Sequence, residues 1–265
     1  MFFGKIIGGL LGLLTGGVIG AIIGLLVGHA FDRGLMKALL FASPQNIQRI
    51  KTSFFETTFL LSGFLAKADG RISQSEIDHT EQLIAQMGLN AAQRKEAIEL
   101  FRRGAAPDFD PEKAVRAFVN TCGPQRQLQQ TLLFFLVSLA HADQALGPPE
   151  HAALVRIAGL MGLGATRLEQ LLRMAQAQEH FHQGSEYSAT ATSNSLGDAY
   201  TALGVETSVS DKELKRAYRK LMSENHPDKL IAKGVPEGMV KLATERSQEI
   251  QAAYELIRKH RGLVK

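Results

Sequence analysis

The start of the chain lacks the alternation of apolar and polar positions found in the remainder. The stretch 6–31 contains 26 residues, and His29 is its only ionisable residue. A helix of that length measures about 39 Å, which exceeds the roughly 30 Å of a bilayer core. A secretory signal has a shorter apolar run followed by a small-residue cleavage site, and a surface helix of a soluble protein has a polar face. The pattern therefore predicts a transmembrane helix at 6–31.

Basic residues around this helix predict its orientation. One lysine precedes the helix, and four basic residues follow it closely: Arg33, Lys37, Arg49 and Lys51. The excess of Lys and Arg marks the cytoplasmic side, so we expect residues 1–5 in the periplasm and the C-terminal bulk in the cytoplasm. The single cysteine, Cys122, excludes an internal disulfide and agrees with a reducing compartment.

Glycine recurs at every fourth position of the apolar stretch. This set, the glycine face, comprises Gly4, Gly8, Gly12, Gly16, Gly20, Gly24 and Gly28. Small residues at this spacing let two helices approach closely in lipid, where packing drives association. Because glycine is also common in membrane helices, composition is the alternative explanation. The regular spacing favours a homodimer through the central set Gly12, Gly16 and Gly20.

The region 46–182 shows helical periodicity and an internal repeat. The stretches 65–89 and 139–163 share Leu, Ala, Ala-Asp, a glutamate and a final Met-Gly-Leu. Capping patterns occur at Ser73–Glu76, Asn90–Gln93 and Asp110–Pro111. These signals predict an all-helical domain of about seven helices. The shared A-D-x-x-I/L-x-x-x-E pattern resembles the TerB-like domain associated with tellurite resistance, and it implies an interaction platform.

Acidic residues in the repeat raise the alternative of a metal site. They are Asp69, Glu76, Asp143 and Glu150. Their spacing does not match a calcium loop, which places oxygen ligands at alternating positions, whereas helix capping explains it. We expect His141 and His151 to be surface or packing residues. We therefore predict no metal and no cofactor.

The stretch 183–195 is polar and nearly uncharged, which is typical of a flexible linker. Residues 196–265 then form a compact helical unit of their own. Its second helix begins with Ser210 and Glu213 as a capping box, with Val209 able to pack on Leu214. One side of this helix is apolar and the other is basic. The helix ends at about Asn225, because Pro227 cannot continue it.

His226, Pro227 and Asp228 follow that helix, and an apolar helix with Ala243, Ile250, Ala253, Tyr254 and Ile257 on one side comes next. DAYTALGV, LKRAYRKL, HPD and EIQAAYELI in this order closely resemble the J-domain family. The resemblance implies an antiparallel helical hairpin. It also implies a DnaK-type ATP-dependent chaperone as partner, whose ATPase the domain stimulates.

The resemblance assigns roles to particular residues. His226, Pro227 and Asp228 are implied to contact the chaperone at its domain junction, and the implied docking residues are Tyr218, Lys215, Arg216, Arg219 and Lys220. Tyr218 is also expected to pack within the hairpin. Asn225 stands where an aromatic residue is usual, and Glu224 where a basic one is usual. Charge pairing at such a surface speeds encounter and weakens with salt.

Three other functions have less support. The net charge of +4 is small and the basic face of this helix lacks interleaved aromatic residues, so we expect no nucleic-acid binding. An enzyme using His226 and Asp228 as an acid–base pair lacks a recognisable nucleophile, so we expect no catalysis. A membrane scaffold for envelope stress, acting through the TerB-like domain, remains the alternative. The whole arrangement resembles the membrane-anchored DnaJ-like co-chaperones of the Gram-negative inner membrane.

Overall fold

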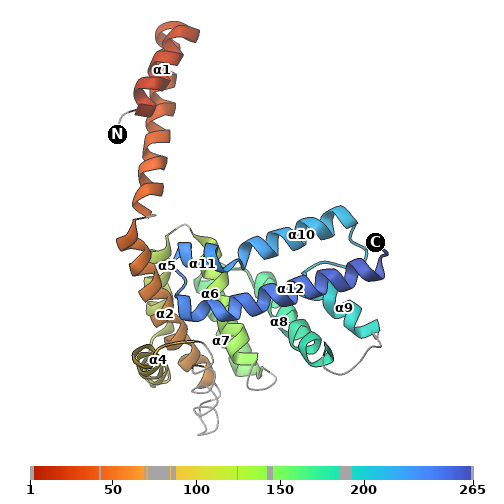
Figure 1. Ribbon diagram of the computed structural model, residues 1–265. Helices are drawn as coiled ribbons and strands as arrows, with labels where there is room; N and C mark the ends of the chain where they lie inside the picture. Colours follow the sequence, from red (N-terminus) through yellow and green to blue (C-terminus); the bar gives the residue numbers. More distant parts are fainter. Residues whose placement is uncertain are drawn as a thin grey trace. The chain divides into compact units, whose positions relative to one another are not determined.

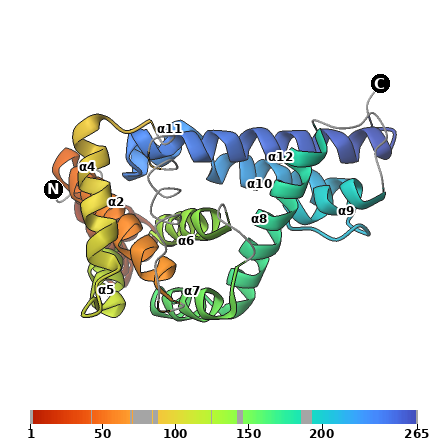
Figure 2. The ribbon, with the colours of Figure 1, turned by 90° about the horizontal axis from the view of Figure 1, so that it is seen from below.

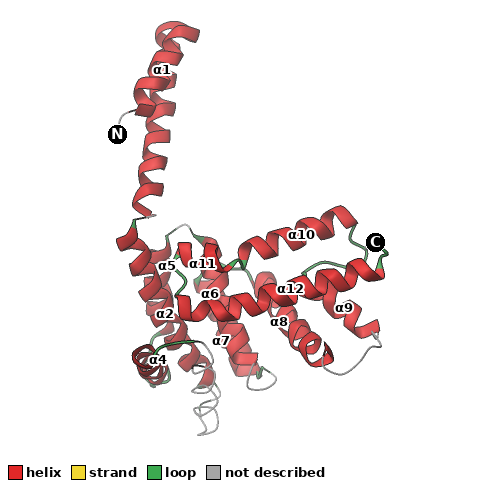
Figure 3. Ribbon diagram, viewed as in Figure 1, coloured by secondary structure: helices red, strands yellow, loops and turns green. Residues whose placement is uncertain are grey.

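The computed structural model of the protein describes residues 3–41, 43–68, 70, 84, 88–123, 125–141, 146–185 and 193–263, and every regular element in these ranges is a helix (Figure 3). This confirms the predicted all-helical fold class. The chain divides into two compact units, Met1–Arg49 and Ile50–Lys265. Figure 1 labels the helices α1 Phe3–Phe41, α2 Pro44–Ala66, α4 Ala91–Gly104, α5 Pro111–Cys122, α6 Arg126–His141, α7 Pro148–Leu160, α8 Ala165–Ser185, α9 Ser193–Ala202, α10 Asp211–Glu224, α11 Pro227–Lys233 and α12 Val240–His260, and the short 3-10 helix η1 spans Glu237–Met239.

Helix α1 contains the apolar stretch, and its segment Phe3–Asp32 is long and apolar enough to cross a membrane. It is not straight, however. Gly16 (φ −138°, ψ 18°) and Gly17 (φ 59°, ψ −146°) have non-helical backbone angles. The angles of Gly17 are essentially restricted to glycine. The prediction of one uninterrupted helix over 6–31 therefore differs from the structure, because Gly17 adopts a turn conformation that other residues resist.

The two arms of α1 lie antiparallel and touch through the glycine face (Figure 1). A Cβ atom built on Gly8 would lie 2.2 Å from the Gly24 carbonyl oxygen, and one on Gly12 would lie 2.0 Å from that of Gly20. Only glycine permits such contacts. The Asp32 carboxylate accepts hydrogen bonds from the Gly4 and Lys5 amides, at 2.9 and 3.1 Å. Asp32 thus caps free N–H groups at the start of the first arm.

The helices from α2 to α8 surround an aromatic core. Phe54 of α2 makes edge contacts with Phe118 of α5 and Phe135 of α6, at ring-centroid distances of 5.9 and 5.8 Å. All three rings are buried. Two predicted helix starts are confirmed, since the Asn90 side chain accepts from the Gln93 amide and Asp110 caps α5. The Ser73–Glu76 box and most of the first repeat copy lie outside the described residues.

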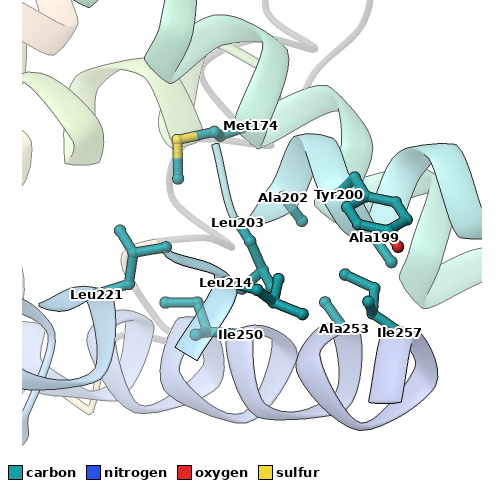
Figure 4. Close-up of a cluster of buried hydrophobic side chains, with 10 residues drawn as sticks. All are labelled: Met174, Ala199, Tyr200, Ala202, Leu203, Leu214, Leu221, Ile250, Ala253 and Ile257. Carbon is teal, nitrogen blue, oxygen red and sulfur yellow. The ribbon is translucent and has the colours of Figure 1, made fainter. Parts of the chain in front are cut away.

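The helices α9 to α12 form the C-terminal part. Figure 2 shows α12 running along this region, with α11 near one end and α9 near the other. Its core lies between α9, α10 and α12 (Figure 4) and contains Ala199, Tyr200, Ala202, Leu203, Leu214, Leu221, Ile250, Ala253 and Ile257.

Met174 of α8 belongs to the same buried cluster. The middle of the expected linker 183–195, residues 186–192, lies outside the described residues. Helix α8 continues to Ser185, and α9 already begins at Ser193. Helices α8 and α9 also pack on each other. The two helical regions are joined by a shared apolar cluster, which a polar linker sequence alone does not reveal.

Candidate functional site

The corner residues, His226, Pro227 and Asp228, connect two helices. Helix α10 ends at Glu224, and the Asn225 amide donates to the Leu221 carbonyl as the helix cap. His226 then takes extended angles (φ −64°, ψ 124°), and Pro227 is the first residue of α11. The predicted helix end at Asn225 is confirmed. The proline fixes the change of direction, because it excludes a continuous helix.

The corner is the start of a helix, and this short helix was not foreseen. The His226 Nδ1 atom accepts a hydrogen bond from the Asp228 amide at 3.2 Å, so the histidine caps α11. Gly234, with φ 102°, ends α11 in the left-handed region. Pro227 at the first position and Gly234 after the last are the sequence signals that identify this helix.

The corner side chains face solvent. The His226 side chain is 51% exposed and that of Asp228 is 87% exposed. The Nδ1–Oδ2 distance of 4.0 Å is too long for a direct hydrogen bond. Such an open pair lacks the enclosed, water-excluding surroundings in which acid–base groups are usually tuned. The geometry suits contact with another surface.

Helix α10 presents a basic face beside the corner. Leu214 and Leu221 are buried, while the basic side chains are exposed; the face comprises Lys212, Lys215, Arg216, Arg219 and Lys220. The capping box at Ser210 is confirmed, because its hydroxyl accepts from the Glu213 amide and the Glu213 carboxylate accepts from the Ser210 amide. The Ser210 hydroxyl and then its amide, which both donate to the Glu213 carboxylate, lower the pKa of Glu213. The start of α10, and with it the orientation of the basic face, is therefore fixed by residues of α10 and its cap.

Tyr218, predicted as a docking residue, lies inside the hairpin. Its ring stacks on Tyr254 of α12, with centroids 4.0 Å apart and planes 6° apart. It is half-buried, so its main contact is with α12. Arg261 fastens the far end of the hairpin by donating to the Tyr200 hydroxyl at 2.7 Å and the Asp211 carboxylate at 2.6 Å. Together these contacts hold the basic face rigidly.

Residues outside the expected set also hold the corner. The Glu224 carbonyl accepts from Gln127 Nε2 of α6 at 2.9 Å, and the Asn225 carbonyl accepts from Ser247 Oγ of α12 at 3.1 Å. The role of Gln127 was not predicted from the sequence, because nothing local distinguishes it from its neighbours Gln125 and Gln129.

Arg246 was also missed, although the sequence does mark it. It stands among Ala243, Ile250 and Ala253 at the spacing of inward positions. It is only 5% exposed, and its guanidinium lies 3.4 Å from the centre of the Phe134 ring. Burial lowers the pKa of Arg246 to about 9, which leaves it cationic at neutral pH.

No cluster of metal-binding side chains occurs among the residues that the structure describes. Glu150 caps a helix start, as expected, by accepting from the Gly147 amide at 2.9 Å. His151 lies 2.8 Å from Glu169 in a half-exposed pair. The other acidic candidates, Asp69, Glu76 and Asp143, lie outside the described residues, as does the side chain of His141.

The proposed dimer glycines have two different environments. Gly12 and Gly20 contact each other between the arms of α1. Gly16 lies in the turn, where a Cβ atom would meet nothing within 4 Å. The structure therefore shows the glycine face packing against itself within one chain.

Comparison with known families covers the three regions separately. Residues 1–38 match the transmembrane domain of the co-chaperone DjlA, residues 56–174 match the tellurite resistance protein TerB, and residues 198–261 match the DnaJ domain. The first match and the apolar helix indicate a single-pass membrane protein. No solved structure matches the chain.

Similar proteins cover almost the entire chain. The chain is 41% identical to the co-chaperone protein DjlA of Shewanella oneidensis over 99% of both sequences. It is 40% identical to that of Vibrio cholerae, over 98% of this chain and 99% of the relative, and 38% identical to that of Coxiella burnetii, over 98% of both. With this identity along all three regions, the chain belongs to the DjlA family of J-domain co-chaperones.

Proposed function

We propose that the protein stimulates ATP hydrolysis by a cytosolic DnaK-type chaperone through its corner residues and basic face. The observation that carries this proposal is the exposed corner at the end of an exposed basic helix, on a hairpin stiffened by the Tyr218–Tyr254 stack. The basic face attracts an acidic surface, and the corner then contacts the partner at a fixed distance from it. In this role the protein regulates a partner's catalysis.

We also propose where the protein lies in the cell. The helix segment Phe3–Asp32 anchors the protein in the inner membrane, and the helices from α2 onward lie in the cytoplasm, where the chaperone and ATP are found. Basic residues after the anchor support this orientation. An activity reporter fused after Lys265 is expected to be active in the cytoplasm. Periplasmic activity of that fusion would contradict both the orientation and the partner.

The proposal also includes a homodimer through Gly12, Gly16 and Gly20. Its support is the contact of the glycine face with itself between the antiparallel arms of α1, which is the close backbone approach that small residues allow. In a dimer, the face of one chain packs on the face of another in place of its own second arm. Such pairing brings two J-domains into proximity at the membrane.

The decisive experiment measures ATP hydrolysis by a DnaK-type chaperone with the full chain in lipid nanodiscs. His226→Gln is expected to abolish the stimulation while leaving the helical circular dichroism unchanged, because the side chain is exposed. His260→Gln is the matched control, since His260 is an exposed histidine at the far end of α12. Full stimulation by His226→Gln would refute the co-chaperone mechanism. It would then favour a scaffold that acts through the TerB-like domain.

A further inference from the structure

The backbone before the corner needs partners from outside its own helix. The last carbonyl groups of an α-helix have no intrahelical donor. At the end of α10, the carbonyls of Glu224 and Asn225 immediately precede His226, and each accepts from a side chain. Ser247 supplies one of these donors from within the J-domain. Gln127 supplies the other from the TerB-like domain, 97 residues earlier in the chain.

Gln127 uses both ends of its amide. Its nitrogen donates to the Glu224 carbonyl at 2.9 Å, and its oxygen accepts from the Lys233 ammonium. Glu224 lies just before the corner, and Lys233 ends the short helix that the corner begins. One half-buried side chain of α6 thus bridges the two segments that flank His226, Pro227 and Asp228. Burial also lowers the pKa of Lys233.

Other contacts show that this bridge is part of a larger interface between the TerB-like domain and the J-domain. The Arg246 guanidinium lies over the buried Phe134 ring at 3.4 Å, an arrangement whose strength rises when both groups are desolvated. Lys51 of α2 pairs with Glu237 of η1 at 3.5 Å. Gly238 faces Leu89 so closely that a Cβ atom there would lie 2.6 Å from a leucine methyl carbon. The J-domain is therefore held along α11, η1 and the first half of α12, while its basic face stays exposed.

We infer that Gln127 is a positioning residue, through which the TerB-like domain fixes the backbone at which the corner meets the chaperone. This inference rests on the proposed co-chaperone function and assigns the TerB-like domain a part in it. Gln127 does not touch the basic face. It therefore affects how effectively a docked J-domain activates hydrolysis, and leaves the initial encounter unchanged.

The test titrates the full chain in nanodiscs against a DnaK-type chaperone and separates maximal stimulation from the half-saturating concentration. Gln127→Leu removes both hydrogen bonds, and we expect maximal stimulation to fall about fivefold, the equivalent of one ordinary hydrogen bond. The half-saturating concentration is expected to stay within about twofold, since encounter depends on the exposed charges of α10. Gln127→Glu keeps the size and an acceptor for Lys233, but it replaces the donor to the Glu224 carbonyl with a charged carboxylate oxygen, so it should also lower the maximum.

Two variants distinguish positioning from a general structural role. Gln130→Leu is the matched control, because Gln130 lies on the same helix and accepts from Arg167 of α8. It should leave both parameters unchanged. Combining Gln127→Lys with Lys233→Gln exchanges the two groups and restores a donor for the Glu224 carbonyl, so it should recover most of the stimulation. Gln127→Lys alone, which brings two ammonium groups together, should not.

The inference is overturned if Gln127→Leu stimulates like the parent, loses no more than Gln130→Leu, or stimulates better. Increased stimulation would mean that the TerB-like domain restrains the corner. These results differ from failure of the proposed function, in which the parent itself does not stimulate or His226→Gln stimulates equally well. Circular dichroism of each variant confirms that the helices are retained.

Discussion

Among the described residues, the arms of α1 form one antiparallel helix pair and α10 with α12 forms another, and the two pairs are packed in opposite ways. In α1 the backbones touch through glycine, and the large side chains point outward, with Leu14 81% and Val18 74% exposed. In the J-domain the large side chains point inward, with Leu214 1% and Ile250 0% exposed. The difference follows from the solvent: water drives apolar side chains together, whereas lipid does not.

The type of packing also determines whether a helix of each pair can pack against a helix of another chain instead. The contact between α10 and α12 depends on interlocking side chains and the tyrosine stack, so it is specific to these two helices. The contact within α1 depends on a repeated glycine, so a second copy of the glycine face offers the same kind of flat backbone surface. Moreover, the first arm, residues 3–15, measures only about 20 Å, and the apolar part of the second, residues 18–31, only about 21 Å, so neither is long enough to cross a bilayer core.

The largest expected effect concerns the α1 turn in a bilayer. A turn at Gly16 and Gly17 exposes backbone groups that hydrocarbon cannot satisfy, so we expect α1 to straighten into one span. Phe3→Cys should then react with a membrane-impermeant maleimide from the periplasmic side. Leu263→Cys should react only from the cytoplasmic side.

The native cysteine does not disturb this experiment, because burial raises the pKa of Cys122 to about 12 and keeps its thiol unreactive. Labelling in spheroplasts and in inverted vesicles provides the comparison. Reaction of both introduced cysteines from the same side would show that the arms remain paired in the membrane.

The next largest effect is on dimerisation. Substitutions on the glycine face distinguish a straight α1 helix from a persistent α1 hairpin. If straight helices pair, both Gly12→Leu and Gly16→Leu should reduce a membrane two-hybrid signal on the order of tenfold, because leucine prevents close approach. Gly4→Leu and Gly28→Leu should matter little, since these positions lie far from the bilayer centre. Val18→Leu, off the glycine face, is the control.

A persistent hairpin gives a different result. Gly16 then lies in open space, whereas a side chain at Gly12 collides with the Gly20 carbonyl. Gly16→Leu would therefore be harmless and Gly12→Leu disruptive. A normal signal from both variants, or an equal loss with Val18→Leu, would exclude the glycine face as the dimer contact.

The two pairs also differ in what the sequence could predict. The J-domain pair follows from local signals: Ser210 and Glu213 start α10, Pro227 ends it, and apolar spacing gives the inner face of α12. In α1 the glycine spacing predicted a surface for close helix packing. It could not identify the packing partner, because the same spacing is compatible with contact inside one chain and with contact between two chains.

Long-range contacts account for the remaining differences. Gln127 is one of several glutamines at the start of α6, and only the folded chain brings it to Glu224. In the sequence, nothing distinguishes Met174 from the other residues of α8, and only the fold places it in the J-domain cluster. Arg246 is the exception among these long-range contacts. A charged residue at an inward helix position indicates a buried contact, although the sequence does not identify Phe134 as the partner.

The smallest effect tests the side-chain packing of the J-domain pair. Ile250→Val deletes one methyl group from a fully buried position, which typically costs about 0.5–1.5 kcal/mol. Hydrogen exchange of the α10 and α12 amides should report this loss as faster opening of the pair. Ile231→Val on α11 makes the same chemical change at a half-buried position and should cost less.

In α1 the opposite change is the costly one, because adding a methyl group at Gly8 places it 2.2 Å from the Gly24 carbonyl oxygen. Equal exchange rates for Ile250→Val and the parent would show that side-chain interlocking does not limit opening of the J-domain pair, and the contrast with the glycine-packed arms would then fail.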